Sequence, residues 1–325
     1  MPDYTPYEPQ IAAPTKPRRN TFEPPDWRAG AIVRAPNWLG DTMMCIPAAH
    51  ALRKLMPADC ELSVLAPAAV APSWEATGWV DRVIRLKGRR ATGSVSRKVR
   101  SLNAGVAVVF PNSFGSALDV TFSGIPVRVG RGGRGRALLL TGRGTAWRES
   151  DREVHFHQVS HYFDVVGLLG DTDRELSVPP LEIADAAGQA ATAGLVTDSG
   201  LRLALAPGAA YGPAKQWPVE RFAEVAREWE SQGGATVVLG TERERPLGET
   251  VCAGSPRCQN LCGATTLSQL MAVLSLSTAC VANDSGTMHL AAALGVNGVG
   301  IFGSTNFLAT GPLGGRWILL SSDLR

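Results

Sequence analysis

Short apolar runs alternate with longer helix-like segments along most of the chain, and this alternation constrains the fold more than any other feature. The runs expected to be strands lie at 31–35, 61–66, 83–86, 105–110 and 127–129, and again at 201–206, 235–239, 278–282 and 298–302. The segments expected to be helices are 41–55, 68–77, 92–102, 114–123 and 156–169, and then 219–231, 242–253, 267–276 and 285–294. Such alternation predicts parallel sheets covered on both faces. We therefore expect two successive doubly wound α/β domains, with ligands at the carboxyl ends of the strands and in the cleft between the domains.

Composition along the 325 residues sets the expected boundaries. Residues 1–28 contain seven prolines and little apolar material, which predicts a disordered tail. The first domain is expected at 29–185 and the second at 201–325. An Ala/Gly/Thr/Asp-rich stretch at 186–200 is the predicted linker.

Several classes of protein are excluded by what the sequence lacks. No run of about 18 apolar residues is present, so no membrane-spanning helix is expected. The first residues have no apolar core of a secretory signal, and six cysteines do not make a disulfide scaffold. Cytoplasm is the expected compartment. Cys252, Cys258 and Cys262 do not have the spacing of zinc ligands, so we expect free thiols there and no bound metal.

Charge is distributed unevenly, although the net charge is only +3. Residues 82–152 carry 15 basic and three acidic residues. Such an excess indicates an acidic partner, and the alternative is a solvated basic face. Within this region, Gly130–Gly135 matches G-x-G-x-x-G but lacks the acidic residue of a dinucleotide site. We interpret it as a basic loop that meets phosphates, and aromatic residues that would indicate nucleic-acid binding are not interleaved with it.

The first motif that carries chemistry is Arg34-Ala-Pro-Asn-Trp-Leu-Gly-Asp41, where the first strand ends and the first helix begins. Asp41 falls at the expected N-cap of that helix, and a capping role alone would explain it. A carboxylate at the carboxyl end of a strand is also where a general base belongs. The sequence leaves both interpretations open.

Three further motifs follow strands of the second domain. The loop at 206–218 contains Gly208 and Lys215, which suit phosphate oxygens, although an exposed lysine is the alternative. In Asn283-Asp-Ser-Gly-Thr-Met-His289, either Asp284 or Ser285 can cap a helix whose first amides would point at an anion. The turn-rich loop 303–314 either lines the site or only connects elements.

Taken together, these motifs resemble the ADP-heptose:lipopolysaccharide heptosyltransferases, glycosyltransferase family 9, and most of all the heptosyltransferase II subgroup. The resemblance rests on PNWLGDTMMCIPAAHALRKLMP, PGAAYGPAKQWP, NDSGTMHLAAALG and IFGSTNFLATGPLG, and it covers about 30–322. It implies the GT-B architecture, two Rossmann-like domains with the active site between them. It also implies an inverting, metal-independent transfer of heptose from ADP-L-glycero-D-manno-heptose onto the first heptose of the lipopolysaccharide inner core. The alternatives are another acceptor or heptosyltransferase step within the family, or an inactive protein that binds sugar nucleotides.

The resemblance also assigns roles to residues. Asp41 matches the proposed general base of the family. The residues that match the donor site are Lys215, Glu244 (with Glu242 as an alternative for the ribose), Asp284, Ser285, Gly286, Thr287, Met288 and His289. The expected contacts of the phosphorylated acceptor are Asn37, Arg131, Arg134 and Arg136.

The same resemblance places the protein at the cytoplasmic surface of the inner membrane as a peripheral enzyme, with no cofactor, metal or nucleic acid. Two departures from the family pattern stand out. Asn306-Phe-Leu-Ala replaces a more polar Asp-Pro stretch, and members of the family usually continue past the position of Arg325 with a Cys-containing segment and a helix. The last segment of the second domain is therefore expected to be missing.

Overall fold

The computed structural model describes residues 5–13, 25–89, 91, 93–133, 135–144, 156–177, 179–195, 200–209 and 215–321. The chain divides into two compact units, each with its own sheet. Gln10–Pro179 form the N-terminal unit, whereas Pro180–Arg325 and Met1–Pro9 form the C-terminal unit. The strand pairs of both sheets are parallel, as the alternation predicts.

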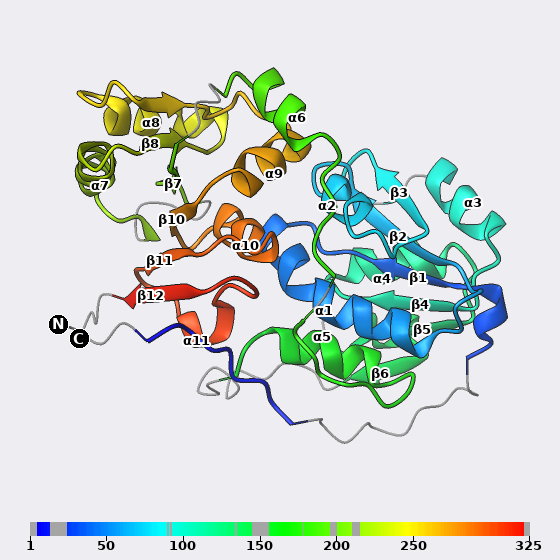
Figure 1. Cartoon of the computed structure of the whole chain (residues 1–325). Coiled ribbons are helices and arrows are strands. Elements are labelled where there is room, and N and C mark those ends of the chain that lie inside the picture. The colour runs from blue at the N-terminus through cyan, green and yellow to red at the C-terminus, as the bar shows by residue number, and fades with distance from the viewer. Residues whose placement is uncertain are drawn as a thin grey trace. The chain divides into compact units, whose positions relative to one another are not determined.

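The N-terminal unit contains a six-stranded sheet in the order β3-β2-β1-β4-β5-β6 (Figure 1). Its strands are β1 (Ala31–Arg34), β2 (Leu62–Pro67), β3 (Arg82–Leu86), β4 (Val106–Val109), β5 (Val127–Arg131) and β6 (Gly142–Gly144). Its helices are η1 (Trp27–Ala29), α1 (Leu39–Leu55), α2 (Ala71–Glu75), α3 (Gly93–Ser101), α4 (Phe114–Thr121), η2 (Arg136–Leu139) and α5 (Val159–Val166). Helix α1 packs against α5, whereas Val99 of α3 and Val120 of α4 join a core cluster with the sheet. The unit is therefore a doubly wound Rossmann-like domain.

The C-terminal unit repeats this plan in the order β12-β11-β10-β7-β8-β9. Its strands are β7 (Arg202–Ala206), β8 (Ala235–Val238), β9 (Cys258–Asn260), β10 (Ala279–Asn283), β11 (Gly298–Phe302) and β12 (Trp317–Ser321). Its helices are α6 (Ala186–Thr192), α7 (Val219–Ser231), η5 (Glu242–Glu244), α8 (Arg245–Cys252), α9 (Leu267–Ser275), α10 (Gly286–Ala293) and α11 (Phe307–Thr310). Helix α6 lies inside the stretch that composition marks as a linker, and it packs against α9.

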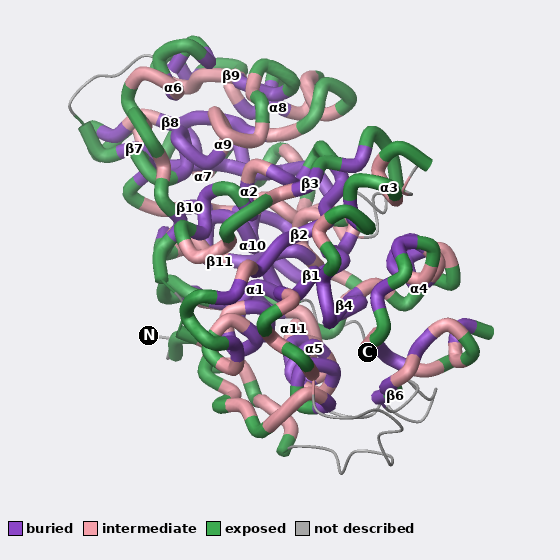
Figure 2. The backbone as a smooth tube through the Cα atoms, turned by 90° about the vertical axis from the view of Figure 1, so that its right-hand side faces the viewer, coloured by how far each residue is buried: buried purple, intermediate pink, exposed green. Residues whose placement is uncertain are grey.

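Apolar strands fill the centre of both units (Figure 2). The four residues of β1 and the five of β7 are all buried, which explains why these strands have almost no polar alternation in sequence. In each sheet the strand order reverses beside the first strand, between β1 and β4 and between β7 and β10. Such switch points are where doubly wound sheets bind ligands, so the residues after β1 and β10 are well placed for function.

Part of the predicted N-terminal tail is ordered, unlike the expectation. The backbone N–H of Tyr7 donates to the carbonyl of Trp317 over 2.6 Å, within the C-terminal unit. The N–H of Ala12 donates to Oγ of Ser160 over 3.0 Å, within the N-terminal unit. The prediction of disorder is therefore wrong for residues 5–13, where backbone hydrogen bonds and the ring of Tyr7, edge-on to that of Phe307 with 6.4 Å between the centroids, hold the segment.

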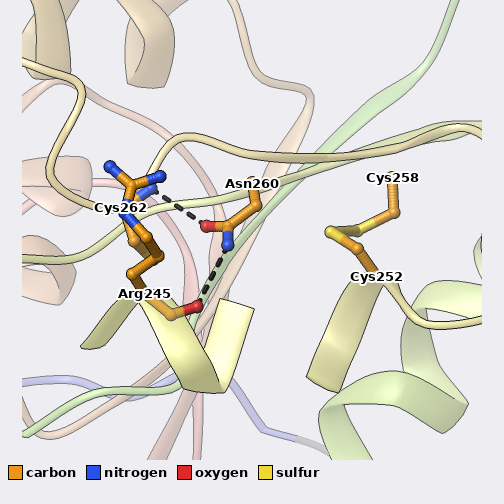
Figure 3. The surroundings of a disulfide bond; sticks show 5 residues. All are labelled: Arg245, Cys252, Cys258, Asn260 and Cys262. Carbon is orange, nitrogen blue, oxygen red and sulfur yellow. Dashed lines mark hydrogen bonds between the residues drawn. A yellow bond between two sulfur atoms is a disulfide. The ribbon is translucent and has the colours of Figure 1, made fainter. Parts of the chain in front are cut away.

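Cys252 and Cys258 form a disulfide that joins the end of α8 to the start of β9, with 5.1 Å between the two Cα atoms (Figure 3). The prediction of free thiols is wrong for these two residues. Hydrogen bonds from the N–H of Ser255 to the carbonyl of Cys252 and from the N–H of Cys258 to the carbonyl of Ser255, both 3.0 Å, fold the intervening turn back on itself. Cys262 is a buried free thiol, as predicted.

Candidate functional site

Asp41 lies in the first turn of α1, just after the carboxyl end of β1. The helix begins at Leu39, two residues earlier than the sequence predicts, and its N-cap is Trp38. The expectation that Asp41 is the N-cap is therefore wrong. Because the chain turns into the helix before Asp41, its carboxylate is available for contacts with other elements.

The partner of this carboxylate comes from a distant part of the chain. Nε2 of Gln158, the residue before α5, donates to Oδ1 of Asp41 over 3.2 Å and to Oη of Tyr162 over 2.9 Å. Burial raises the pKa of Asp41, and the hydrogen bond from Gln158 opposes this rise. The carboxylate of Asp41 in turn adds to the burial that raises the pKa values of Cys45 and Tyr162. A desolvated carboxylate with a raised pKa, held among neutral groups, suits proton transfer.

A buried ion pair organises the loop that contains Asn37. Nε of Arg34 lies 3.1 Å from Oδ2 of Asp119, and both side chains are 1% exposed. Nη2 of Arg34 also donates to Oδ1 of Asn37 over 3.2 Å and to the carbonyl of Arg89 over 2.8 Å. The guanidinium of Arg89 lies over the ring of Trp38, 5.0 Å from its centroid. Arg34 thus ties the Asn37 loop to the segment after β3.

Arg131 and Arg136 form a second polar group in the N-terminal unit. Arg136 is fully buried, and its Nη1 donates to the carbonyls of Pro111 and Ser113. Its Nε and Nη2 have no hydrogen-bond partner among the described residues. Burial, and after it the neighbouring charge of Arg131, lowers the pKa of Arg136 to about 10. Two neighbouring guanidinium groups in a partly desolvated place form an attractive position for an anion.

Arg131 also connects this group to the neighbourhood of Asp41, because its charge and that of Asp41 both act on Tyr162. The third predicted acceptor arginine, Arg134, lies outside the described residues.

In the C-terminal unit, Lys215 and Asp284 form an ion pair. Nζ of Lys215 lies 2.7 Å from Oδ2 of Asp284, and the same oxygen accepts a 2.8 Å hydrogen bond from Oγ1 of Thr305. Asp284 follows β10, so the pair lies at the switch point of this sheet. The loop 303–314 therefore contributes a contact through Thr305 rather than only joining two elements.

Asn283 holds this corner of the sheet together. Its Nδ2 donates to the carbonyl of Pro207 over 2.7 Å, and its Oδ1 accepts from the N–H of Trp217 over 3.0 Å. The pairing of Ala282 with Ala206 brings the ends of β10 and β7 side by side, so the side chain of Asn283 can reach the carbonyl of Pro207. The completely buried amide thereby fixes both ends of the loop that carries Lys215.

Ser285 is the N-cap of α10, and its Oγ accepts from the N–H of Met288 over 3.4 Å. Of the three amides expected to face an anion, that of Met288 already has a partner within the helix. Gly286 and Thr287 occupy the first two helical positions, where the helix dipole favours negative charge. His289 lies one turn into the helix and is buried.

Glu244 and Glu242 differ in what they contact. Oε2 of Glu244 accepts from the N–H and from Oγ1 of Thr241, over 2.6 and 2.8 Å. The Glu244 carboxylate fills the space beside Gly208 where a Cβ would otherwise lie, so it sits at the carboxyl end of β7. Glu242 instead makes two 2.8 Å hydrogen bonds with Arg245 at the surface. The geometry therefore favours Glu244 over Glu242 as the carboxylate at the edge of the sheet.

Comparison with known proteins identifies the family. The family model described as "Glycosyltransferase family 9 (heptosyltransferase)" matches residues 92–325. The chain belongs to glycosyltransferase family 9. The lipopolysaccharide heptosyltransferase 2 of Escherichia coli K12 is 31% identical over 304 residues, which cover 87% of this chain and 85% of that protein. The lipooligosaccharide heptosyltransferase 2 of Haemophilus influenzae is 29% identical over 296 residues, with the same coverage.

Solved structures agree with this assignment. The E. coli ADP-heptose lps heptosyltransferase II is similar with a TM-score of 0.78 at 29% identity, over 90% of both chains. A family 9 glycosyltransferase from Veillonella parvula has the same fold, with a TM-score of 0.76 at 24% identity over 90% of this chain and 87% of that one. The predicted family and the two Rossmann-like domains of the GT-B class are thus confirmed, and this family 9 member is a glycosyltransferase.

Sequence reasoning missed Gln158, Tyr162, Asn283 and Thr305 as parts of these sites. Gln158 lies 117 residues from Asp41, in a segment without a recognisable motif. Asn283 and Thr305 stand inside quoted motifs, and their polar side chains next to strand ends were the signal that could have singled them out. Among the described residues, no group of three or more His, Cys, Asp or Glu side chains could hold a metal ion. No helix in the described part is long and apolar enough to cross a membrane.

Proposed function

We propose that this family 9 glycosyltransferase moves heptose from ADP-L-glycero-D-manno-heptose onto the first heptose of the lipopolysaccharide inner core, with inversion at the anomeric carbon. The observation that carries the proposal is the desolvated Asp41 carboxylate at the switch point of the N-terminal sheet. The names of relatives at about 30% identity over most of the chain support the choice of donor and acceptor.

In this proposal Asp41 is the general base. An acceptor hydroxyl oxygen attacks the anomeric carbon, and a carboxylate oxygen of Asp41 takes the hydroxyl proton as the new C–O bond forms. The bond from the anomeric carbon to the β-phosphate oxygen breaks, and its electron pair leaves with ADP. Because the raised pKa of Asp41 makes its carboxylate a stronger base than an exposed aspartate, burial favours the transfer.

The C-terminal unit is the proposed donor site. Lys215 and the amides of Gly286 and Thr287 supply positive charge toward the diphosphate, whose negative charge grows as ADP leaves. Asp284 positions Lys215 and lies near the donor sugar, and Glu244 binds the ribose hydroxyls. The remaining proposed donor contacts are Ser285, Met288 and His289.

The N-terminal unit is the proposed acceptor site. Arg131 and Arg136, together with Arg134, would bind phosphate groups of the acceptor, and Asn37 would contact its sugar. Exposed basic residues of the same region, such as Lys87 and Lys98, would face the anionic inner leaflet, which places the enzyme at that membrane as a peripheral protein. The transfer is proposed to proceed without a metal, since Lys215 and the helix amides provide the charge that the leaving group needs.

The test is an ADP-release assay with ADP-heptose in EDTA, with and without a mono-heptosylated Kdo2–lipid A acceptor. Acceptor-dependent release in EDTA supports the donor, the acceptor and the metal-independent mechanism together. Release that returns only after Mg²⁺ is added contradicts the metal-independent part. Binding of ADP-heptose by calorimetry without release contradicts the proposed acceptor, and no binding contradicts the proposed donor.

A further inference from the structure

Gln158 is the one side chain that hydrogen-bonds the proposed base in the described contacts, and it comes from a different element. We propose that Gln158 is the positioning residue of Asp41: its amide holds Oδ1 in place and so leaves Oδ2 to accept the proton of the acceptor hydroxyl. This inference rests on the proposed role of Asp41 as a base. It adds a residue that no motif of the sequence contains.

The backbone around Gln158 is fastened on both sides. The N–H of His157 donates to the carbonyl of Gln10 over 2.8 Å, and Nδ1 of the buried His157 accepts from the N–H of Val159 over 3.1 Å. Two residues further on, Oγ of the buried Ser160 accepts from the N–H of Ala12 over 3.0 Å. Since α5 also packs against α1, the position of Gln158 relative to Asp41 is set by several independent contacts.

The side chain of Gln158 is oriented as well as placed. An amide nitrogen has two hydrogens, and here one points to Oδ1 of Asp41 and the other to Oη of Tyr162. Tyr162 is only 7% exposed, and its ring lies edge-on to Phe110, with 5.2 Å between the centroids. Because Tyr162 cannot move freely, its hydroxyl fixes the plane of the amide and therefore the direction of the hydrogen bond to Asp41.

The neutrality of the amide matters for the chemistry. The groups that face Asp41 are Cys45 on its own helix and Gln158 and Tyr162 beside and on α5, with Arg131 of β5 acting on Tyr162. Burial and the Asp41 charge raise the pKa values of Cys45 and Tyr162, so both stay protonated at neutral pH. A lysine or arginine in place of Gln158 would hold the carboxylate equally well, but its charge would lower the pKa of the base much further. The amide orients the base without neutralising it.

The first test compares the pH dependence of turnover in Gln158→Leu and wild type. Loss of the hydrogen bond misplaces the carboxylate, so kcat falls about 10- to 100-fold while the KM for ADP-heptose is unchanged. The same loss removes an interaction that favours the charged form, so the acidic limb of the kcat profile moves to higher pH. Unchanged kcat, or a loss of kcat with the acidic limb in its wild-type position, overturns the proposal.

Two further variants separate positioning from general packing. Gln232→Leu is the matched control, because Nε2 of the exposed Gln232 donates to Oε1 of Glu228 over 2.9 Å far along the sequence from Asp41. It should leave kcat and the acidic limb unchanged. Tyr162→Phe keeps the amide but removes its second anchor, so it should lower kcat by less than Gln158→Leu. A larger fall in Tyr162→Phe would mean that the tyrosine, not the amide, positions the base.

A second measurement does not depend on turnover. The ¹³C carboxyl resonance of Asp41, identified by its absence in Asp41→Asn, is titrated in wild type and in Gln158→Asn, which keeps a neutral amide but has a side chain too short to span both contacts. A midpoint that moves to higher pH supports the proposal, and an identical midpoint overturns it. If wild type releases no ADP, the proposed function fails, and this titration still decides whether Gln158 controls the carboxylate.

Discussion

The ion pair between Arg34 and Asp119 gives a sharp test of how the N-terminal unit is held together. Both side chains are 1% exposed, so removal of either partner leaves the other charge in a poorly solvated place. Breaking such a pair typically costs about 3–5 kcal/mol of the free energy of unfolding. The two single variants should differ within that range, because the partners have different remaining contacts.

In Asp119→Ala, the guanidinium of Arg34 keeps the carbonyls of Ala35 and Arg89 and Oδ1 of Asn37 as acceptors. We therefore expect Asp119→Ala to lower the free energy of unfolding by an amount near the lower limit, about 3 kcal/mol. In Arg34→Met, the Asp119 carboxylate keeps the N–H of Ala91, but an amide does not neutralise its charge. Arg34→Met should therefore lower the free energy of unfolding by an amount near the upper limit, about 5 kcal/mol.

The double variant Arg34→Met/Asp119→Leu removes both charges and fills their space with apolar atoms. It should cost about 2 kcal/mol, mainly from the lost hydrogen bonds to Asn37 and Arg89, and so far less than the sum of the single variants. The assay is urea unfolding of the full chain, with hydrogen exchange of the β1 and β4 amides as the signal of the N-terminal unit.

The matched control is the exposed pair between Arg221 and Glu224, whose side chains are 57% and 52% exposed. Arg221→Met should cost under about 1 kcal/mol. If Asp119→Ala and Arg34→Met also cost under about 1 kcal/mol, or if their effects add in the double variant, the reasoning about buried charge is refuted.

Four other predictions concern the two candidate sites. Asp41→Asn should lower acceptor-dependent ADP release roughly 100-fold or more while ADP binding by calorimetry is unchanged. The pKa of Asp41 is higher in the folded than in the unfolded protein, so folding favours the protonated carboxyl. The contribution of this group to the free energy of unfolding is therefore full in acid and is lost as the pH rises through the folded pKa. Asp41→Asn should therefore melt higher than wild type at pH 7.5, and the difference should shrink toward pH 4; a constant difference would contradict this. Lys215→Ala should lower kcat about 100-fold by weakening stabilisation of departing ADP, and Lys215→Arg should recover part of it in the same assay. Gly208→Ala places a Cβ where the Glu244 carboxylate lies, so the KM for ADP-heptose should rise about tenfold, whereas Glu242→Gln should leave it unchanged.

The central elements of both sheets could be predicted from the sequence because their strands are buried on both faces. The strand expected at 298–302 and the helix expected at 219–231 have the predicted bounds in the structure. Strands β6 and β9 were missed because each has only three residues, and Gly142–Gly144 contains two glycines and an arginine. The five-residue β12, Trp317–Ser321, was missed although it is an apolar run.

The candidate site residues could be singled out from the sequence where they follow strand ends within a motif. Asp41, Lys215, Asp284 and Ser285 were identified in this way, and the structure pairs Lys215 with Asp284 directly. Gln158 was not predictable, because its contact with Asp41 depends on how α5 packs on α1 rather than on any local pattern.

The hydrogen bonds of the Asn283 side chain allow a prediction about the sequences of homologous genes. Nδ2 of Asn283 donates to the carbonyl of Pro207 over 2.7 Å and its Oδ1 accepts from the N–H of Trp217 over 3.0 Å, and the side chain is fully buried. A carboxylate of the same shape would place two acceptors against each other at Pro207. Among homologous genes, an aspartate at this position would therefore mark copies in which the loop that carries Lys215 is no longer held by these two hydrogen bonds.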